Sequence, residues 1–100
     1  MDIKHKQTGN KGMFFIEEGD STVAEMVYSL PSADKMIIEH TEVDDSLQGK
    51  NVGLQLLNAT VAFARKENIK IIPLCSFAKA MFEKKAELRD VLFDVSRRSV

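Results

Sequence analysis

Residues 48–53, with the sequence QGKNVG, place two glycines and a lysine directly before an amphipathic segment. If that segment is a helix, the N–H groups of its first turn lack intrahelical partners and lie at the positive end of the helix dipole. Gly49 and Gly53 leave the backbone open to a phosphate, and Lys50 adds a positive charge. The chemistry that this loop suits is the binding of a pyrophosphate. An ordinary tight turn is the alternative, because a glycine pair alone is a weak signal.

Few side chains near this loop could exchange a proton or act as a nucleophile. His40 lies on a strand-like segment, three positions after Ile37 and therefore expected on the opposite face of the strand. A histidine suits a general base near neutral pH, and Glu39 and Glu42 are alternative bases. The alternative for all three is a structural or solvated side chain. Cys75 ends a later apolar run, where the N-terminus of a following helix would favour the thiolate, or where the thiol could simply be a small buried apolar group.

Three strands are predicted before the loop. The runs at residues 12–18 and 22–30 are separated by Gly-Asp-Ser, which predicts a hairpin. A turn at residues 31–34 leads to a third strand at residues 35–43, which completes an antiparallel meander. Residues 1–10 before it are expected to be frayed. Tyr28 and the phenylalanines Phe14, Phe15, Phe77 and Phe82 are interpreted as core or cleft-lining residues.

The pattern changes after the loop. From residue 52 to about residue 67 apolar side chains recur at intervals of three and four, which predicts a helix that stops at Asn68. Residues 69–75 form a short apolar strand, so that strand, helix and strand make a right-handed βαβ unit with the loop at the carboxyl end of two parallel strands. Ligands of open α/β sheets usually bind at that edge. Ser76 is expected to cap a second helix, after which an apolar tail packs back onto the sheet and residues 96–100 fray. The tail comprises Leu88, Val91, Leu92 and Phe93.

Composition limits the class of protein. A chain of 100 residues predicts one domain, with any substrate site in a surface cleft. With 14 basic and 15 acidic residues, the chain is too balanced for nucleic acid or an anionic membrane to be the main partner. There is no membrane-spanning run and no signal-peptide pattern, and a single cysteine excludes an internal disulfide. We therefore expect a cytoplasmic protein.

The loop is similar to the (Gln/Arg)-x-x-Gly-x-(Gly/Ala) signature with which the GNAT superfamily binds acetyl-coenzyme A, with Gln48 and Gly53 at its first and last defined positions. Asn51 replaces the middle glycine, although asparagine best tolerates the left-handed backbone for which glycine is used. Two further motifs, HTEV at residues 40–43 and PLCSF at residues 73–77, stand in the order and at the intervals typical of small, stand-alone GNAT-like proteins. The chain therefore resembles that family over most of its length.

The resemblance implies an α/β (α+β) fold shortened at its N-terminus, with acetyl-coenzyme A where the two parallel strands splay apart. Members of the superfamily usually transfer the acetyl group to a primary amine, here a protein lysine, a chain terminus or a small polyamine. Backbone N–H groups from Thr41 to Val43 would polarise the thioester carbonyl. The residues expected to contact the coenzyme are Thr41, Val43, Gln48, Gly49, Lys50, Asn51, Val52, Gly53 and Phe77. Four cations could meet its 3′-phosphate or form a solvated helix face, namely Lys79, Lys84, Lys85 and Arg89.

Attack by an amine on a thioester requires a base that removes a proton from the amine. The candidate catalytic residues are His40, Glu42 and Cys75. Cys75 could accept the acetyl group, form a mixed disulfide with coenzyme A, or protonate the departing thiolate. The alternative function is a coenzyme A-binding or thiol-sensing module with little transfer activity. We expect no metal, and a monomer or a weak dimer.

Overall fold

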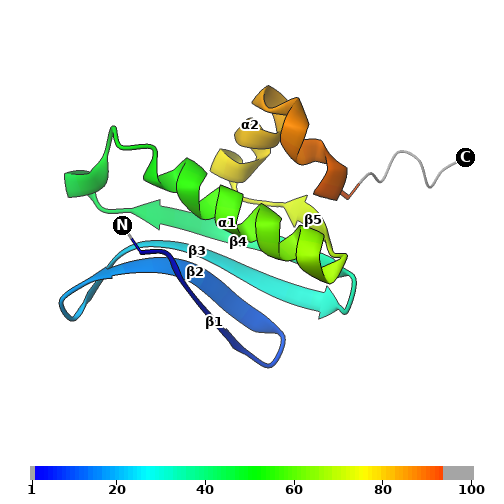
Figure 1. Cartoon of the computed structure of the whole chain (residues 1–100), viewed down its shortest axis with the longest axis horizontal. Coiled ribbons are helices and arrows are strands. Elements are labelled where there is room, and N and C mark those ends of the chain that lie inside the picture. Colours follow the sequence, from blue (N-terminus) through cyan, green and yellow to red (C-terminus); the bar gives the residue numbers. More distant parts are fainter. Residues whose placement is uncertain (1, 94–100) are drawn as a thin grey trace, which may run out of the picture.

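The computed structural model describes residues 2–93, and its strands form one mixed sheet in the order β1-β2-β3-β4-β5 (Figure 1). The first four strands pair antiparallel, whereas β4 and β5 are parallel. This arrangement confirms the predicted meander and parallel pair. The strands are β1 (Lys4–Thr8), β2 (Lys11–Glu18), β3 (Ser21–Ser32), β4 (Lys35–Val43) and β5 (Lys70–Pro73).

Helix α1 (Val52–Glu67) makes the crossover between the parallel strands and contacts β2, β3 and β4 across one face of the sheet (Figure 1). Its apolar stripe is the one expected from the sequence, and the helix ends at Asn68, whose left-handed backbone has a φ of 57°. A short 3-10 helix, η1 (Asp45–Leu47), precedes the loop at residues 48–53. Helix α2 (Ser76–Lys84) and a second 3-10 helix, η2 (Ala86–Val91), follow β5. Within residues 2–93, no helix is both long and apolar enough to cross a membrane.

The N-terminal segment differs from the prediction. In place of a frayed segment at residues 1–10 with a first strand near residue 12, β1 pairs with β2 along its whole length. Every residue of β1 is exposed, so the segment lacks the apolar alternation by which a strand is recognised in a sequence. It is held by His5, which stacks on Phe14 at 4.1 Å between ring centroids and bonds through Nε2 to the hydroxyl of Tyr28 at 2.5 Å. Residues 96–100 lie outside the described part of the chain.

The core lies between the sheet and α1. Met26, Tyr28 and Ile38 from the sheet are fully buried against Leu56 and Leu57 of α1. The Tyr28 ring is in the core and its hydroxyl reaches the β1 edge, as expected. Burial raises the pKa of that hydroxyl. The sheet and helix together therefore provide the rigid support from which the loop at residues 48–53 projects.

The segment after β5 adds a small correction and a confirmation. Cys75, not Ser76, caps α2, because its Sγ accepts the N–H of Ala78 at 3.3 Å. Strand β5 ends at Pro73 and is shorter than predicted. The apolar tail packs back as expected: Leu92 forms a parallel bridge with Ile71. The N–H of Phe93 donates to the carbonyl of Ile71 at 2.8 Å. The outer edge of β5 is thus covered by the chain itself.

Candidate functional site: a cleft where two parallel strands separate

Strands β4 and β5 separate halfway along β4. Their pairing stops at Ile38 and Pro73, and both Leu74 and Cys75 donate their N–H groups to the Ile38 carbonyl, at 3.1 and 3.3 Å. Beyond this point β4 pairs with β3 on one side, and no strand within residues 2–93 pairs with residues 39–43 on the other side. The backbone of this half of β4 is therefore open to a ligand on its β5 side.

A bulge in β4 marks the same place. Val27 of β3 faces His40, whereas the next residue, Tyr28, faces Ile38, so Glu39 is an extra residue in the ladder. A bulge shifts the alternation of side chains by one position. His40 therefore lies on the same face as Ile37, and the prediction that the two occupy opposite faces is wrong. Beyond the bulge, Thr41 points to the α1 side of the sheet.

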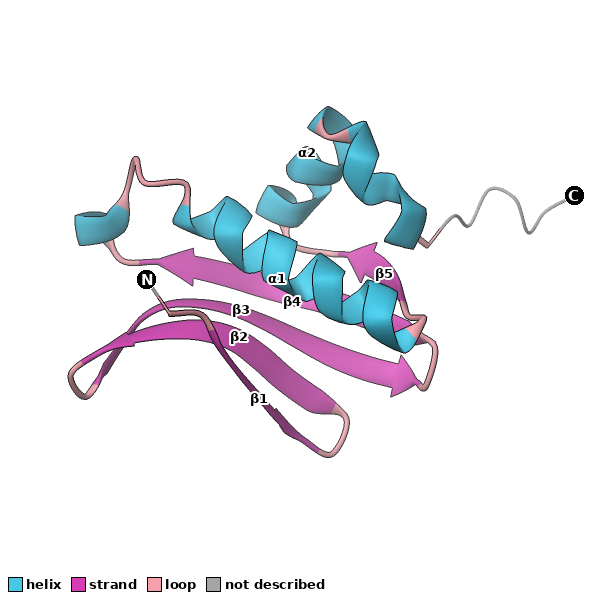
Figure 2. Ribbon diagram, viewed as in Figure 1, coloured by secondary structure: helices cyan, strands magenta, loops and turns pink. Residues whose placement is uncertain are grey.

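A cleft of about 620 Å³ opens at this point between β4, the loop before α1 and helix α2. Figure 2 shows how η1 and this loop connect the end of β4 to the start of α1. The cleft gathers every residue predicted to contact the coenzyme except Lys50. These residues are Thr41, Val43, Gln48, Gly49, Asn51, Val52, Gly53 and Phe77. The sequence therefore identified one wall of a real concavity, formed by segments from four different elements.

The loop has the backbone that a phosphate site requires. Gly49 has a φ of 84° and Asn51 a φ of 57°, so asparagine occupies the left-handed position for which the signature uses glycine, as predicted. No side chain caps α1, and the first hydrogen bond of the helix runs from the N–H of Gln55 to the carbonyl of Asn51 at 3.0 Å. The N–H groups of Val52, Gly53 and Leu54 accordingly have no helical partner and lie at the positive end of the dipole.

Gly53 also has a packing role that the sequence did not reveal. A Cβ atom at this position would lie 2.8 Å from Cζ of Phe77, which is closer than carbon atoms can approach. Phe77 reaches this position from the first turn of α2. The missing side chain of Gly53 therefore lets the two helices approach at the base of the cleft.

One side of α2 completes the cleft. Met81 and Lys84 line it together with Phe77, at the spacing i, i+4 and i+7 that places side chains on one helical face, and Lys85, which directly follows α2, lines it as well. Two of the four candidate cations thus face the site, and this spacing was the sequence signal that distinguishes Lys84. The other two lie around a separate hollow, where the Arg89 guanidinium donates to the backbone carbonyls of Phe82 and Glu83.

Cys75 stands behind the cleft wall. Its half-buried Sγ lies 3.3 Å from the hydroxyl oxygen of Thr41, which lines the cleft. The same sulfur accepts the N–H of Ala78, so it sits at the N-terminus of α2 with two polar neighbours. Thr41 and Cys75 are 34 positions apart in the sequence, and their contact forms just beyond the point where β4 and β5 separate.

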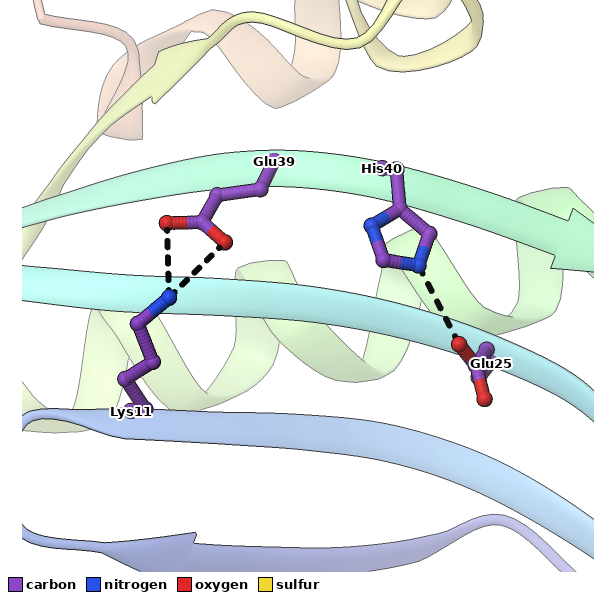
Figure 3. A network of polar contacts seen from close by, with 4 residues as sticks. All are labelled: Lys11, Glu25, Glu39 and His40. Atoms are coloured by element: carbon purple, nitrogen blue, oxygen red, sulfur yellow. Dashed lines mark hydrogen bonds and ion pairs between the residues drawn. The ribbon is translucent and has the colours of Figure 1, made fainter.

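The other two candidate catalytic residues lie elsewhere. His40 and Glu42 project from the face of the sheet opposite α1. His40 Nε2 lies 3.1 Å from Oε2 of Glu25 on this face (Figure 3). One carboxylate oxygen each from Glu25 and Glu42 and one ring nitrogen of His40 lie within 4.8 Å of one another. The structure thus brings His40 and Glu42 together with Glu25, which the sequence analysis did not single out, and gives them no contact with Cys75.

Glu39, the alternative base, is already engaged. Hydrogen bonding to Ser29 and then to Lys11 lowers the pKa of its carboxyl group. Lys11 Nζ lies 3.3 Å from one of its carboxylate oxygens and 3.5 Å from the other (Figure 3). A carboxylate held in its ionised form by a hydroxyl and an ammonium group is a weak base, which makes Glu39 a poor candidate for proton abstraction.

Comparisons with known proteins agree with this geometry. Residues 13–91 match the family model described as GCN5-related N-acetyl-transferase. A GCN5-like protein from Staphylococcus aureus, whose structure was solved by NMR, is 40% identical, with 92% of this chain and 89% of that chain covered and a TM-score of 0.69. A GNAT family acetyltransferase from Elizabethkingia anophelis, crystallised with acetyl-CoA bound, has a TM-score of 0.59 at 15% identity. That alignment covers 77% of this chain and 53% of the other. None of the curated proteins compared with the chain matches it.

Proposed function

The chain belongs to the GCN5-related N-acetyl-transferase family, and from this premise we propose that it transfers the acetyl group of acetyl-coenzyme A to a primary amine. The observation that carries the proposal is the presence of three features in one cleft: the uncapped start of α1, the half of β4 that β5 leaves open, and Lys84 and Lys85 at the end of α2. Each offers what a different part of the coenzyme needs. The acceptor class, a protein lysine, a chain terminus or a small polyamine, is part of the proposal.

The pyrophosphate would lie against the loop at residues 48–53. Free N–H groups and the helix dipole attract its charge, and the backbone of this loop is left-handed at Gly49 and Asn51. Lys84 and Lys85, at the other side of the same cleft, would meet the 3′-phosphate. Lys50 does not line the cleft, so its contribution would be a longer-range attraction that salt screens.

The thioester would lie along the open edge of β4. Backbone N–H groups of residues 41–43 that face away from β3 could donate to the carbonyl oxygen, where negative charge develops as the amine attacks. The new C–N bond forms as the C–S bond breaks, and the sulfur of coenzyme A leaves as a thiolate. The Thr41 hydroxyl and the Cys75 thiol, 3.3 Å apart, are two protein groups that could return a proton to it.

The second candidate, a coenzyme A-binding or thiol-sensing module, is favoured by one observation. Cys75 contacts a residue of the cleft wall and is half-buried, so a bound disulfide could reach its sulfur with little rearrangement. Intact mass after incubation with coenzyme A disulfide and, separately, with acetyl-coenzyme A distinguishes the two. A stable adduct that Cys75→Ala abolishes supports the sensor, whereas turnover that survives Cys75→Ala supports direct transfer to the amine.

Calorimetric titration with acetyl-coenzyme A and coenzyme A tests the site. We expect a dissociation constant in the micromolar range, which corresponds to a binding free energy of about −8 kcal/mol. Gly53→Val should abolish this binding, because its side chain would block the approach of the phosphates to the backbone. Asn58→Val is the matched control, since Asn58 is exposed on the same helix and away from the cleft. Equal affinity of both variants would contradict the assigned site. Binding without acetylation of any amine would leave the module as the better account.

A further inference from the structure

We propose, on the basis of the proposed function, that Glu25 positions His40 as the base for the acceptor amine. The acceptor would reach the thioester across the face of the sheet opposite α1. Neither residue lines the coenzyme cleft, and Glu25 belongs to β3, a strand that carries none of the family motifs. The proposal therefore adds a second face to the site.

The first support is position. Ile38 is the last residue of β4 that pairs with β5. The bulge residue Glu39 comes next, and His40 follows it. His40 therefore lies beside the point where β5 separates from β4, and the proposal places the acceptor on the face of the sheet from which His40 projects. The coenzyme would occupy the α1 face, so the opposite face is left for the acceptor. Figure 3 shows His40 and Glu25 in front of the strands, with α1 behind them.

The second support is the state of the imidazole ring. The Nε2 of His40 lies 3.1 Å from the Glu25 carboxylate, which can only accept when ionised, so Nε2 carries the hydrogen. The other nitrogen, Nδ1, then holds a free lone pair, and no other described residue forms a hydrogen bond with the ring. Glu25 is partly buried and His40 is exposed, so the pair is held from the protein side and open on the substrate side.

The third support is the hollow beside the pair. A cavity of about 170 Å³ is lined by Glu25, Glu42 and Asp44, and Val43 borders both this cavity and the coenzyme cleft. Glu25 and Glu42 are directly opposite in the ladder, a pairing of like charges that is unfavourable without a cation. An ammonium group entering here would be attracted to the carboxylates before it meets His40, which fits an acceptor that is cationic in solution.

In the proposed step the ammonium group loses two protons, one to His40 and one to the thiolate of coenzyme A. Nδ1 of His40 takes one proton from the ammonium group, and the neutral nitrogen attacks the thioester carbon. The C–S bond breaks, the second proton of the nitrogen passes to the thiolate of coenzyme A through the Thr41 hydroxyl or the Cys75 thiol, and His40 releases its proton to solvent. Glu25 keeps its charge throughout. Its part is to hold the tautomer and stabilise the imidazolium, so its effect passes entirely through His40.

The experiment combines kinetics with the state of the ring. Rates at saturating acetyl-coenzyme A would be measured with three amines: a lysine peptide blocked at its N-terminus, a peptide with a free N-terminus, and spermidine. We expect His40→Ala to lower kcat about 100-fold and Glu25→Ala about tenfold, with the calorimetric affinity for acetyl-coenzyme A unchanged. Glu25→Ala should cost nothing further in the His40→Ala background. Glu25→Gln, which keeps an acceptor oxygen, should recover part of the loss.

The matched control is Glu17→Gln, which removes the same charge from the neighbouring strand, where Glu17 pairs with Lys4 at 3.0 Å. Long-range proton–nitrogen NMR supplies a readout that needs no acceptor: the neutral His40 ring should be the Nε2–H tautomer in the parent and mixed in Glu25→Ala. Additive losses in the double variant, an unchanged tautomer, or a kcat loss in Glu42→Gln as large as in His40→Ala would each overturn the proposal. Intact acetyl-coenzyme A binding with no amine acetylated would overturn it together with the transfer function, whereas loss of kcat confined to the His40 variants would remove Glu25 alone.

Discussion

The contact between Gly53 and Phe77 gives a prediction whose sign depends on a second residue. Gly53 is in the first turn of α1, where alanine favours the helix over glycine by up to about 1 kcal/mol. A methyl group there would meet the Phe77 ring at 2.8 Å, however, and overpacking of this kind costs about 1–3 kcal/mol. Gly53→Ala should therefore be neutral or destabilising by up to about 2 kcal/mol in the parent protein.

The same substitution should change sign when the ring is removed. In a Phe77→Leu background the propensity gain has no opposing clash, and Gly53→Ala should stabilise by up to about 1 kcal/mol. The coupling free energy between the two positions is then about 1–3 kcal/mol. Urea denaturation of the four proteins, with a common m-value, measures it. An equal effect of Gly53→Ala in both backgrounds would refute the packing role of Gly53.

Calorimetry on the same four proteins separates packing from phosphate binding. If the coenzyme approaches the backbone at Gly53, the double variant should bind it at least tenfold more weakly even though its stability is restored. If affinity returns together with stability, the loss in Gly53→Ala came from displacement of Phe77 into the cleft. That second outcome would contradict the assignment of the phosphate position to the start of α1.

The remaining predictions concern charge and backbone. Lys84→Gln and Lys85→Gln should each weaken coenzyme A binding about two- to fivefold and leave the binding of coenzyme A lacking the 3′-phosphate unchanged. Lys66→Gln, at the far end of α1, is the control. Equal losses for both ligands would disprove a 3′-phosphate contact. Burial lowers the pKa of His5 from its ordinary 6.5, so the folded state binds fewer protons than the unfolded chain, and stability should fall as the pH drops through 6.5 toward the lowered pKa. Urea midpoints at about pH 7.5 and 5.5 should differ more for the parent than for a His5→Gln variant, and an identical difference would show that His5 does not contribute. Asn51→Ala should lower the free energy of unfolding by about 1 kcal/mol and Asn51→Gly should not, because only the alanine is strained at a φ of 57°. Equal stability of the two variants in urea denaturation would argue against a left-handed backbone at this position.

The sequence was sufficient wherever the information is local. Strand alternation, the helical period and the turn residues predicted β2 to β5, α1 and α2, because hydrogen bonds and burial in these elements repeat at fixed intervals along the chain. The loop at residues 48–53 was readable for the same reason, and even the departure at Asn51 could be interpreted, since left-handed backbone is a property of single residues. Strand β1 was missed because none of its side chains is buried.

Tertiary structure decided everything that depends on segments distant in the sequence. The bulge at Glu39 reversed the face on which His40 lies, and no periodicity reveals where a ladder gains an extra residue. Glu25 became the partner of His40 because β3 and β4 are adjacent, and Gly53 met Phe77 because β5 carries the start of α2 to the start of α1. The sequence by itself predicted which residues have the chemistry that an acetyl-transfer site needs. Only the packing of strands and helices decided which of them face the same space.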